Sequence, residues 1–424
     1  MENTPLFSEI CALYLSNEDI SNVMCVRLRV RDPIDGEILK NAEETAAVRY
    51  PYFCVELKKQ GKDYVFEKND RHVVVINSEK GVELNSEESN YHLFSVSWYE
   101  NRLFLYMSHA LTDGTGMYRF LQTLLYYYIS EYYNKKLNCP GVWLVTDPIE
   151  EEELVDHARH MEKVPVEEGG ELSPGLNVVK KAELKNDTEK TVHSIVISES
   201  EFMKFNFQNE GSPATMISLL LARAFADIFP DASEKIRISV CINLRKGMDT
   251  PRAHHGNVGG IWLEYLDRIR DWPLEKQMIA FRGKLIAESR QEKLLMAVSN
   301  SIRGTERLLA MENDDERAAA SKDAVEGFRD LQTATVSYVG KANFGDIEQY
   351  IEEFHMWAPA VFENVLLELS AINGRMFIDF IQNFSDRRFF DAFLRQLSQN
   401  GIAYQSQSTH RLEIPKTRLP WIRG

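Results

Sequence analysis

The stretch Ser108-His109-Ala110-Leu111-Thr112-Asp113-Gly114-Thr115-Gly116-Met117 lies between two contrasting patterns. Before it, residues 102–107 (RLFLYM) are mostly apolar and rich in strand-forming side chains. After it, apolar side chains recur at helical spacing, at Met117, Phe120, Leu121, Leu124, Leu125, Tyr128, Ile129 and Tyr132. The two patterns predict a buried strand that ends near His109, a turn at residues 114–116, and an amphipathic helix.

Such a junction is well suited to chemistry. A buried strand fixes the imidazole of His109, and glycines allow a substrate to approach the backbone closely. The first turn of the helix offers N–H groups that have no partner within the helix, and these favour negative charge.

Length and composition limit the class of protein. The 424 residues suffice for two lobes with separate cores, and 44% hydrophobic with 27% charged residues is typical of a globular protein. A net charge of -15 argues against a nucleic-acid binder and against docking on anionic lipid. The five cysteines are scattered without Cys-x-x-Cys spacing, so we expect reduced thiols in a cytoplasmic protein. No apolar run is long enough to span a membrane, so we expect no membrane span.

The first lobe is predicted to contain mainly strands. Strand patterns cover 23–30, 50–57, 64–66, 73–76, 92–98 and 102–107, and a helical pattern covers 36–48. The last two strands should form a hairpin through residues 99–101. The acidic run 150–153 is expected to be a solvated helix face, and the loop-like composition of 167–175 places a lobe boundary after residue 172.

The second lobe mixes strands and helices. We expect strands at 192–197, 236–242, 333–340, 364–370 and 375–381, helices at 214–229, 273–289, 292–309 and 386–397, and a tail that returns at 410–414. Ser212-Pro213 is a helix start, and Asn373-Gly374 is the strongest hairpin signal in the chain. Residues 312–317 are expected to form a charged, exposed loop.

The central stretch resembles the His-x-x-x-Asp-Gly motif of the chloramphenicol-acetyltransferase-like superfamily of CoA-dependent acyltransferases. A second resemblance supports it: Asn243-Leu244-Arg245 followed by Gly256-Asn257 is similar to the Asn-x-Arg and Gly-Asn signature of the same superfamily. The order of elements over about residues 20–135 resembles alcohol acetyltransferases. The resemblance implies an α/β fold with two lobes, 1–172 and 173–424, each a mixed sheet with flanking helices, and an active-site tunnel between them.

The resemblance also implies roles for individual residues. His109 would be the general base, and Asp113 would pair with Arg245 in a structural contact beside Gly114. Arg245, Asn257 and Ser337 are implied to contact substrate, with Ser337 on a strand, 333–340, that crosses between the lobes. Many relatives carry a second histidine where this chain has Ser108, which bears on how the site is oriented.

The function implied is transfer of an acyl group, with acetyl as the first candidate, from acyl-CoA to a small alcohol or amine. Acyl-CoA is a co-substrate, no cofactor is expected to be bound, and a monomer is the expectation for the family. Two alternatives stay open: a condensation-type enzyme whose donor arrives on a carrier protein, and a relative that binds without catalysis. Adjacent His254 and His255 should point apart on an extended segment, so no metal site is expected there.

Overall fold

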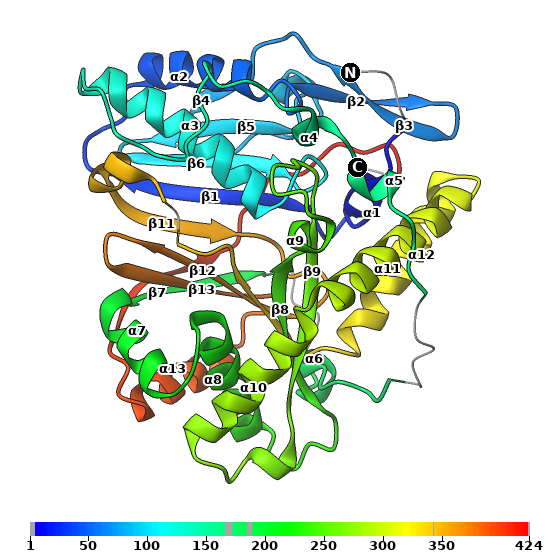
Figure 1. Ribbon diagram of the computed structural model, residues 1–424, viewed down its shortest axis with the longest axis vertical. Helices are drawn as coiled ribbons and strands as arrows, with labels where there is room; N and C mark the ends of the chain where they lie inside the picture. The colour runs from blue at the N-terminus through cyan, green and yellow to red at the C-terminus, as the bar shows by residue number, and fades with distance from the viewer. Residues whose placement is uncertain (1–4, 166–171, 185–188, 342, 423–424) are drawn as a thin grey trace.

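The structure is a computed structural model that describes residues 5–165, 172–184, 189–341 and 343–422. Two β-sheets lie one above the other in the view of Figure 1, with α2 and α3 on the outer side of one sheet and α7, α8 and α13 on the outer side of the other. The helices are α1 (Ser8–Tyr14), α2 (Gly36–Arg49), α3 (Gly114–Tyr132), α4 (Glu151–Leu154), α5 (His157–His160), α6 (Val178–Lys181), α7 (Glu199–Gln208), α8 (Pro213–Ile228), α9 (Arg245–Met248), α10 (Leu274–Glu288), α11 (Gln291–Ala310), α12 (Asp314–Arg329) and α13 (Arg388–Gln399).

The first sheet has five strands and the second has seven. In spatial order, the first consists of β11 (Ile351–Trp357), β1 (Val23–Val30), β6 (Arg102–Ser108), β5 (Phe94–Tyr99) and β4 (Val75–Asn77). The second consists of β14 (Tyr404–Arg411), β7 (Thr191–Ser198), β13 (Arg375–Gln382), β12 (Val365–Ile372), β10 (Ala334–Tyr338), β8 (Ile236–Asn243) and β9 (Val258–Tyr265). A separate hairpin pairs β2 (Val55–Gln60) with β3 (Asp63–Lys68).

Each sheet has its own hydrophobic core, so the predicted two-lobed α/β class is confirmed. The helices α2 and α3 pack on the first sheet, and α8 and α13 pack on the second. Both predicted hairpins are present: β5 pairs with β6, and β12 pairs with β13 across Asn373 and Gly374, which both have positive φ angles. The division after residue 172 stays a prediction, and residues 166–171 lie outside the described residues.

The strand that crosses between the lobes is β11, and not the 333–340 segment expected from the sequence. β11 follows the second-lobe strand β10 in the chain but pairs with β1 in the first sheet, for example at Cys25 opposite Trp357. β10 itself lies between β12 and β8 inside the seven-stranded sheet. A strand that follows the second lobe in the chain is thus held to the first lobe by its backbone hydrogen bonds with β1.

Two other predictions were wrong. The charged segment 312–317 is not an exposed loop, because Asn313 caps α12 and Arg317 is fully buried, donating to the carbonyls of Leu308 and Lys62. The expected strand at 50–57 begins only at Val55, because residues 51–54 form a turn. In both segments, the polarity or the local pattern of the side chains predicted one structure and contacts in the folded protein favour another.

The acidic run at 150–153 also differs from expectation, because Glu153 is fully buried. Its carboxylate accepts hydrogen bonds from the two terminal guanidinium nitrogens of Arg49, at 2.9 and 3.0 Å, and from one guanidinium nitrogen of Arg252 at 2.9 Å. Burial alone would raise the pKa of Glu153, but these hydrogen bonds hold it below its ordinary value. The pair connects α2 to the segment that leaves the first lobe.

No helix among the described residues combines the length and the apolar composition needed to cross a membrane.

Replacing Glu153 with alanine should destabilise the protein strongly. The change leaves the guanidinium of Arg49 buried without its partner, so we expect the free energy of unfolding to fall by about 3–5 kcal/mol. Urea denaturation followed by tryptophan fluorescence measures this. Glu151→Ala, at an exposed position of the same short helix, is the matched control and should change the value by about 0.5 kcal/mol or less. Equal losses in the two variants would contradict this role of the buried pair.

Candidate active site

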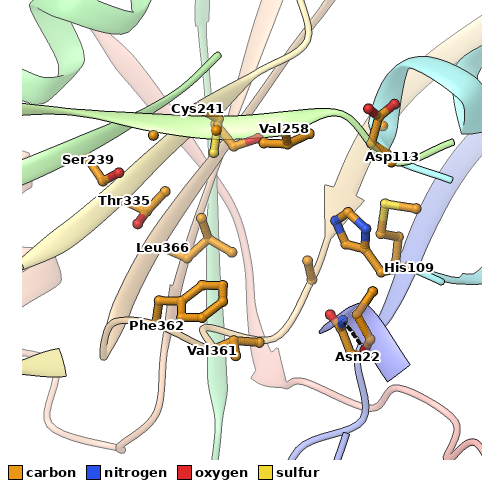
Figure 2. Close-up of a pocket in the computed structure, with 18 of the residues that line it drawn as sticks. Asn22, His109, Asp113, Ser239, Cys241, Val258, Thr335, Val361, Phe362 and Leu366 are labelled. Atoms are coloured by element: carbon orange, nitrogen blue, oxygen red, sulfur yellow. Dashed lines mark hydrogen bonds between the residues drawn. The ribbon is translucent and has the colours of Figure 1, made fainter. Parts of the chain in front are cut away.

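A cavity of about 590 Å³ lies where the two lobes meet. Met24 and His109 reach it from the ends of β1 and β6, and Met356 reaches it from the crossing strand. Its other walls come from α1, α11, α12 and the face of the second sheet that contains β8, β9, β10 and β12. Figure 2 shows part of this wall opposite His109 and Asp113.

His109 directly follows β6, as the sequence predicted. Its backbone N–H donates to the carbonyl of Asn22 at 3.0 Å, and the Asn22 amide in turn donates to the carbonyl of Ala12 at 3.0 Å. The side chain is half-buried and its imidazole points into the cavity (Figure 2). Among the described residues, none donates to or accepts from the ring, so both ring nitrogens are left to a bound molecule.

Asp113 and Arg245 come together as the resemblance implied, 132 positions apart in the chain. The two guanidinium nitrogens lie 2.6 and 3.1 Å from the two carboxylate oxygens, and both side chains are almost completely buried. The same carboxylate accepts hydrogen bonds from the backbone N–H groups of Thr115, Gly116 and Asn257. The first two of these bonds cap the N-terminus of α3. Burial would raise the pKa of Asp113, but Arg245 and the N–H donors lower it below its ordinary value.

These contacts give Asp113 a structural role. Each of its oxygens is already held by Arg245 and by backbone N–H groups, and the carboxylate points away from His109 (Figure 2). Arg245 also donates to the carbonyls of Ala253 and His255. The pair therefore fixes the loop between β8 and β9 against the first turn of α3.

Gly116 lies where there is no space for a side chain. A Cβ atom at this position would lie 1.9 Å from the Thr112 hydroxyl oxygen. That hydroxyl donates to the carbonyl of His254 at 2.6 Å, which is a second attachment of the same loop. Gly114 is also tightly placed, since a Cβ atom there would lie 2.8 Å from Val339, just beyond β10.

Of the other site residues predicted from the sequence, one lines the cavity and two do not. Ser337 lines the cavity from β10. Arg245 and Asn257 do not line it; they lie behind Asp113, and the Asn257 amide donates to the carbonyl of His255. The N–H groups of the first helical turn are only in part open to a bound negative charge, because those of Thr115 and Gly116 already donate to Asp113.

Sequence reasoning missed several residues at the site. His254 and His255 do not point apart: their ring centroids are 3.9 Å from each other. His255 pairs with Glu9 of α1 at 2.6 Å, which brings an N-terminal helix that the sequence analysis overlooked onto the cavity wall. Glu363 and Glu368 also line the cavity, and the alternation of β12 was the one local signal for Glu368.

Comparisons with known proteins agree with this arrangement at the level of fold. No protein-family model and no curated protein matches the sequence. Polyketide synthase associated protein 5 from Mycobacterium tuberculosis has a similar structure, with a TM-score of 0.62 at 13% identity over 93% of this chain and 96% of that one. The condensation domain of the Monacolin K polyketide synthase MokA gives 0.59 at 12% identity, over 93% and 96% of the two chains.

A third similar structure is that of TRI101 from F. sporotrichioides, complexed with coenzyme A and T-2. Its TM-score is 0.57 at 10% identity, over 93% of this chain and 98% of that one. Condensation domains and TRI101 acetyltransferases are members of the CoA-dependent acyltransferase superfamily, and this chain has their two-lobed fold.

The stability contribution of Asp113 should depend on pH in a defined direction. Because its pKa is lower in the folded protein than in the unfolded chain, the contribution is complete above the unfolded value of about 3.9 and is lost as the pH falls through the folded value. Asp113→Asn should therefore lower the free energy of unfolding by about 3–5 kcal/mol at neutral pH. Urea titrations of both proteins at several pH values should show this difference shrinking below about pH 4. A difference that stays constant into acid would contradict the ion pair.

Proposed function

We propose that this protein is an acyltransferase that moves an acyl group, with acetyl as the first candidate, from the thioester of coenzyme A to the hydroxyl or amine of a small acceptor. The observation that carries the proposal is the placement of His109. Its imidazole faces a cavity large enough for a small molecule, while Asp113 and Arg245 hold the surrounding backbone in place.

The reaction follows from these positions. The acceptor oxygen or nitrogen attacks the thioester carbonyl carbon as His109 removes its proton, which gives a tetrahedral oxyanion. Collapse of this intermediate breaks the carbon–sulfur bond, and the proton held by His109 passes to the leaving thiolate. Acyl product and free thiol result without a covalent acyl-enzyme.

The oxyanion needs fixed donors. The Ser337 hydroxyl lines the cavity and is proposed for this role. The Gly114 N–H is a second candidate, because Asp113 takes the N–H groups of the two residues that follow it.

The choice of coenzyme A as the donor is supported by the TRI101 structure, which was solved with coenzyme A. The similar condensation domain favours a second candidate, an enzyme that takes its donor from a carrier protein. Acceptor-dependent release of thiol from free acyl-CoA separates these two possibilities, and its absence together with binding of an acylated carrier would favour the second.

His109→Ala should abolish most of the acceptor-dependent thiol release. A positioned histidine base contributes about 10²–10⁴-fold, so kcat is expected to fall by that factor. The assay follows free thiol with acetyl-CoA and longer acyl-CoAs against a panel of alcohols and amines.

The control variant is His72→Ala, because His72 is well exposed and lies outside the cavity. It should retain the wild-type rate. Activity that persists in His109→Ala would remove His109 from the proposed role, and silence of the wild type across the whole panel would contradict transfer from free acyl-CoA.

A further inference from the structure

Several polar side chains of the second sheet face the cavity on the wall opposite His109. In β8, β10 and β12 the residues that line the cavity alternate with residues that pack into the lobe core. On the core side these strands carry Ile238, Val240, Val336 and Leu367. On the cavity side they carry Ser239, Cys241, Thr335, Ser337, Leu366 and Glu368.

The ionisable side chains that line the cavity are mostly acidic. Among the described residues that line the cavity there is no lysine and no arginine, but there are four carboxylic acids. Two of them already have cationic or ionisable partners: Asp113 has Arg245, and Glu9 has His255. Glu363 and Glu368 form no ion pair with any described residue. Arg329, which does not line the cavity, attracts Glu363 electrostatically, whereas among the described residues no cation acts on Glu368.

Glu368 is in a costly environment. It is 5% exposed, and its register partner on β13 is another acid, Asp379, which is itself held by His355 at 2.9 Å. Burial, together with Asp379 and Glu363, raises the pKa of Glu368 to about 8. A buried carboxyl group without a cation is unfavourable, and a cation placed beside it would remove that penalty.

Glu363 is held in position by a chain of hydrogen bonds. Trp262 donates its ring N–H to the Gln332 amide oxygen at 2.9 Å, and the Gln332 amide nitrogen donates to Glu363 at 2.9 Å. Thr335 donates to the same carboxyl oxygen at 2.7 Å. Since Thr335 lies on the side of the cavity opposite His109 in Figure 2, Glu363 is anchored on that side as well.

Aromatic rings complete this end of the cavity. Phe328, Phe362 and Trp262 all line it, and the first two rings are 5.3 Å apart in an edge-to-face arrangement. Aromatic faces next to acidic groups are the surroundings that proteins use to bind organic cations. No lysine or arginine among the described lining residues is available to pair with a carboxylate or a phosphate at this end of the cavity.

We propose that this end of the cavity binds a cationic amine of the acceptor, against Glu368 and Glu363, while a hydroxyl group of the same molecule faces His109. The acceptor class is thus an amino alcohol. This inference rests on the proposed acyl transfer, and it narrows the acceptor within that reaction.

The test uses pairs of acceptors that differ in charge alone. Each member of a series of ω-amino alcohols of increasing chain length is compared with the primary alkanol that carries a methyl group in place of the ammonium, with acetyl-CoA as donor. At about pH 8 the amine is still protonated. For the best-fitting length, we expect kcat/KM to be about tenfold or more higher for the amino alcohol.

Glu368→Gln keeps the size of the side chain but cannot ionise against a bound ammonium group, so the ratio between amino alcohol and alkanol should fall to near one. Glu363→Gln should lower the ratio in the same direction, which guards against a folding defect in either variant. Glu326→Gln removes an exposed carboxylate of α12 that does not line the cavity, and it should keep the wild-type ratio. A wild-type ratio near one, or a ratio that neither cavity variant changes, would overturn the inference while leaving acyl transfer intact.

Failure of the proposed function has a different signature. If no acceptor in either series releases thiol, acyl transfer from CoA fails, and calorimetric titration of the same pairs decides the cation site. Binding of the amino alcohol that is about tenfold tighter than binding of the alkanol, and is lost in Glu368→Gln, would support the site. Equal binding of the two compounds would overturn it.

Discussion

The buried ion pair between Asp113 and Arg245 is the contact on which the site depends. It connects the start of α3, which belongs to the first lobe, with the loop that follows β8 in the second. Removing two charges from water is costly, and the cost is met here by bidentate geometry and by backbone donors that occupy the remaining positions of the carboxylate. A lobe that moved relative to the other would expose this pair or leave one charge alone, so the pair holds the cavity walls in one arrangement.

The pair has a structural role that is distinct from the position of His109. Asp113 is surrounded by donors and its carboxylate points away from His109, so it has no free oxygen with which to orient the imidazole. His109 is instead fixed through its backbone, by Asn22 and by its position at the end of β6. Its ring faces the cavity, and no described residue is hydrogen-bonded to it. Glu368 on β12 and Glu363 just before that strand lie on elements other than β6 and α3, so substitutions there should leave the segment that carries His109 undisturbed.

Local patterns in the sequence predicted those parts of the fold that depend on local physics. Apolar, strand-forming runs identified β1, β6 and β8, and Asn373-Gly374 identified the turn between β12 and β13 because few other residues adopt positive φ. Motif resemblance brought Asp113 and Arg245 together although 132 positions separate them. The misses have a common origin: Glu153 and Arg317 read as solvated charges, but each is buried by partners distant in the chain, Arg49 for the first and Lys62 for the second. The acids of the cavity wall were missed for the same reason, since alternation places Glu368 on a face but does not say that the face is hollow.

The central claim is that the thioester and the acceptor meet at His109. The most direct measurement is a crystal structure with a thioether analogue of acetyl-CoA, which binds but does not transfer its acyl group. We expect the analogue to enter the cavity with its carbonyl beside the His109 imidazole, close to Ser337 or the Gly114 N–H. An analogue that binds elsewhere, or that leaves the cavity empty at saturating concentration, would contradict it.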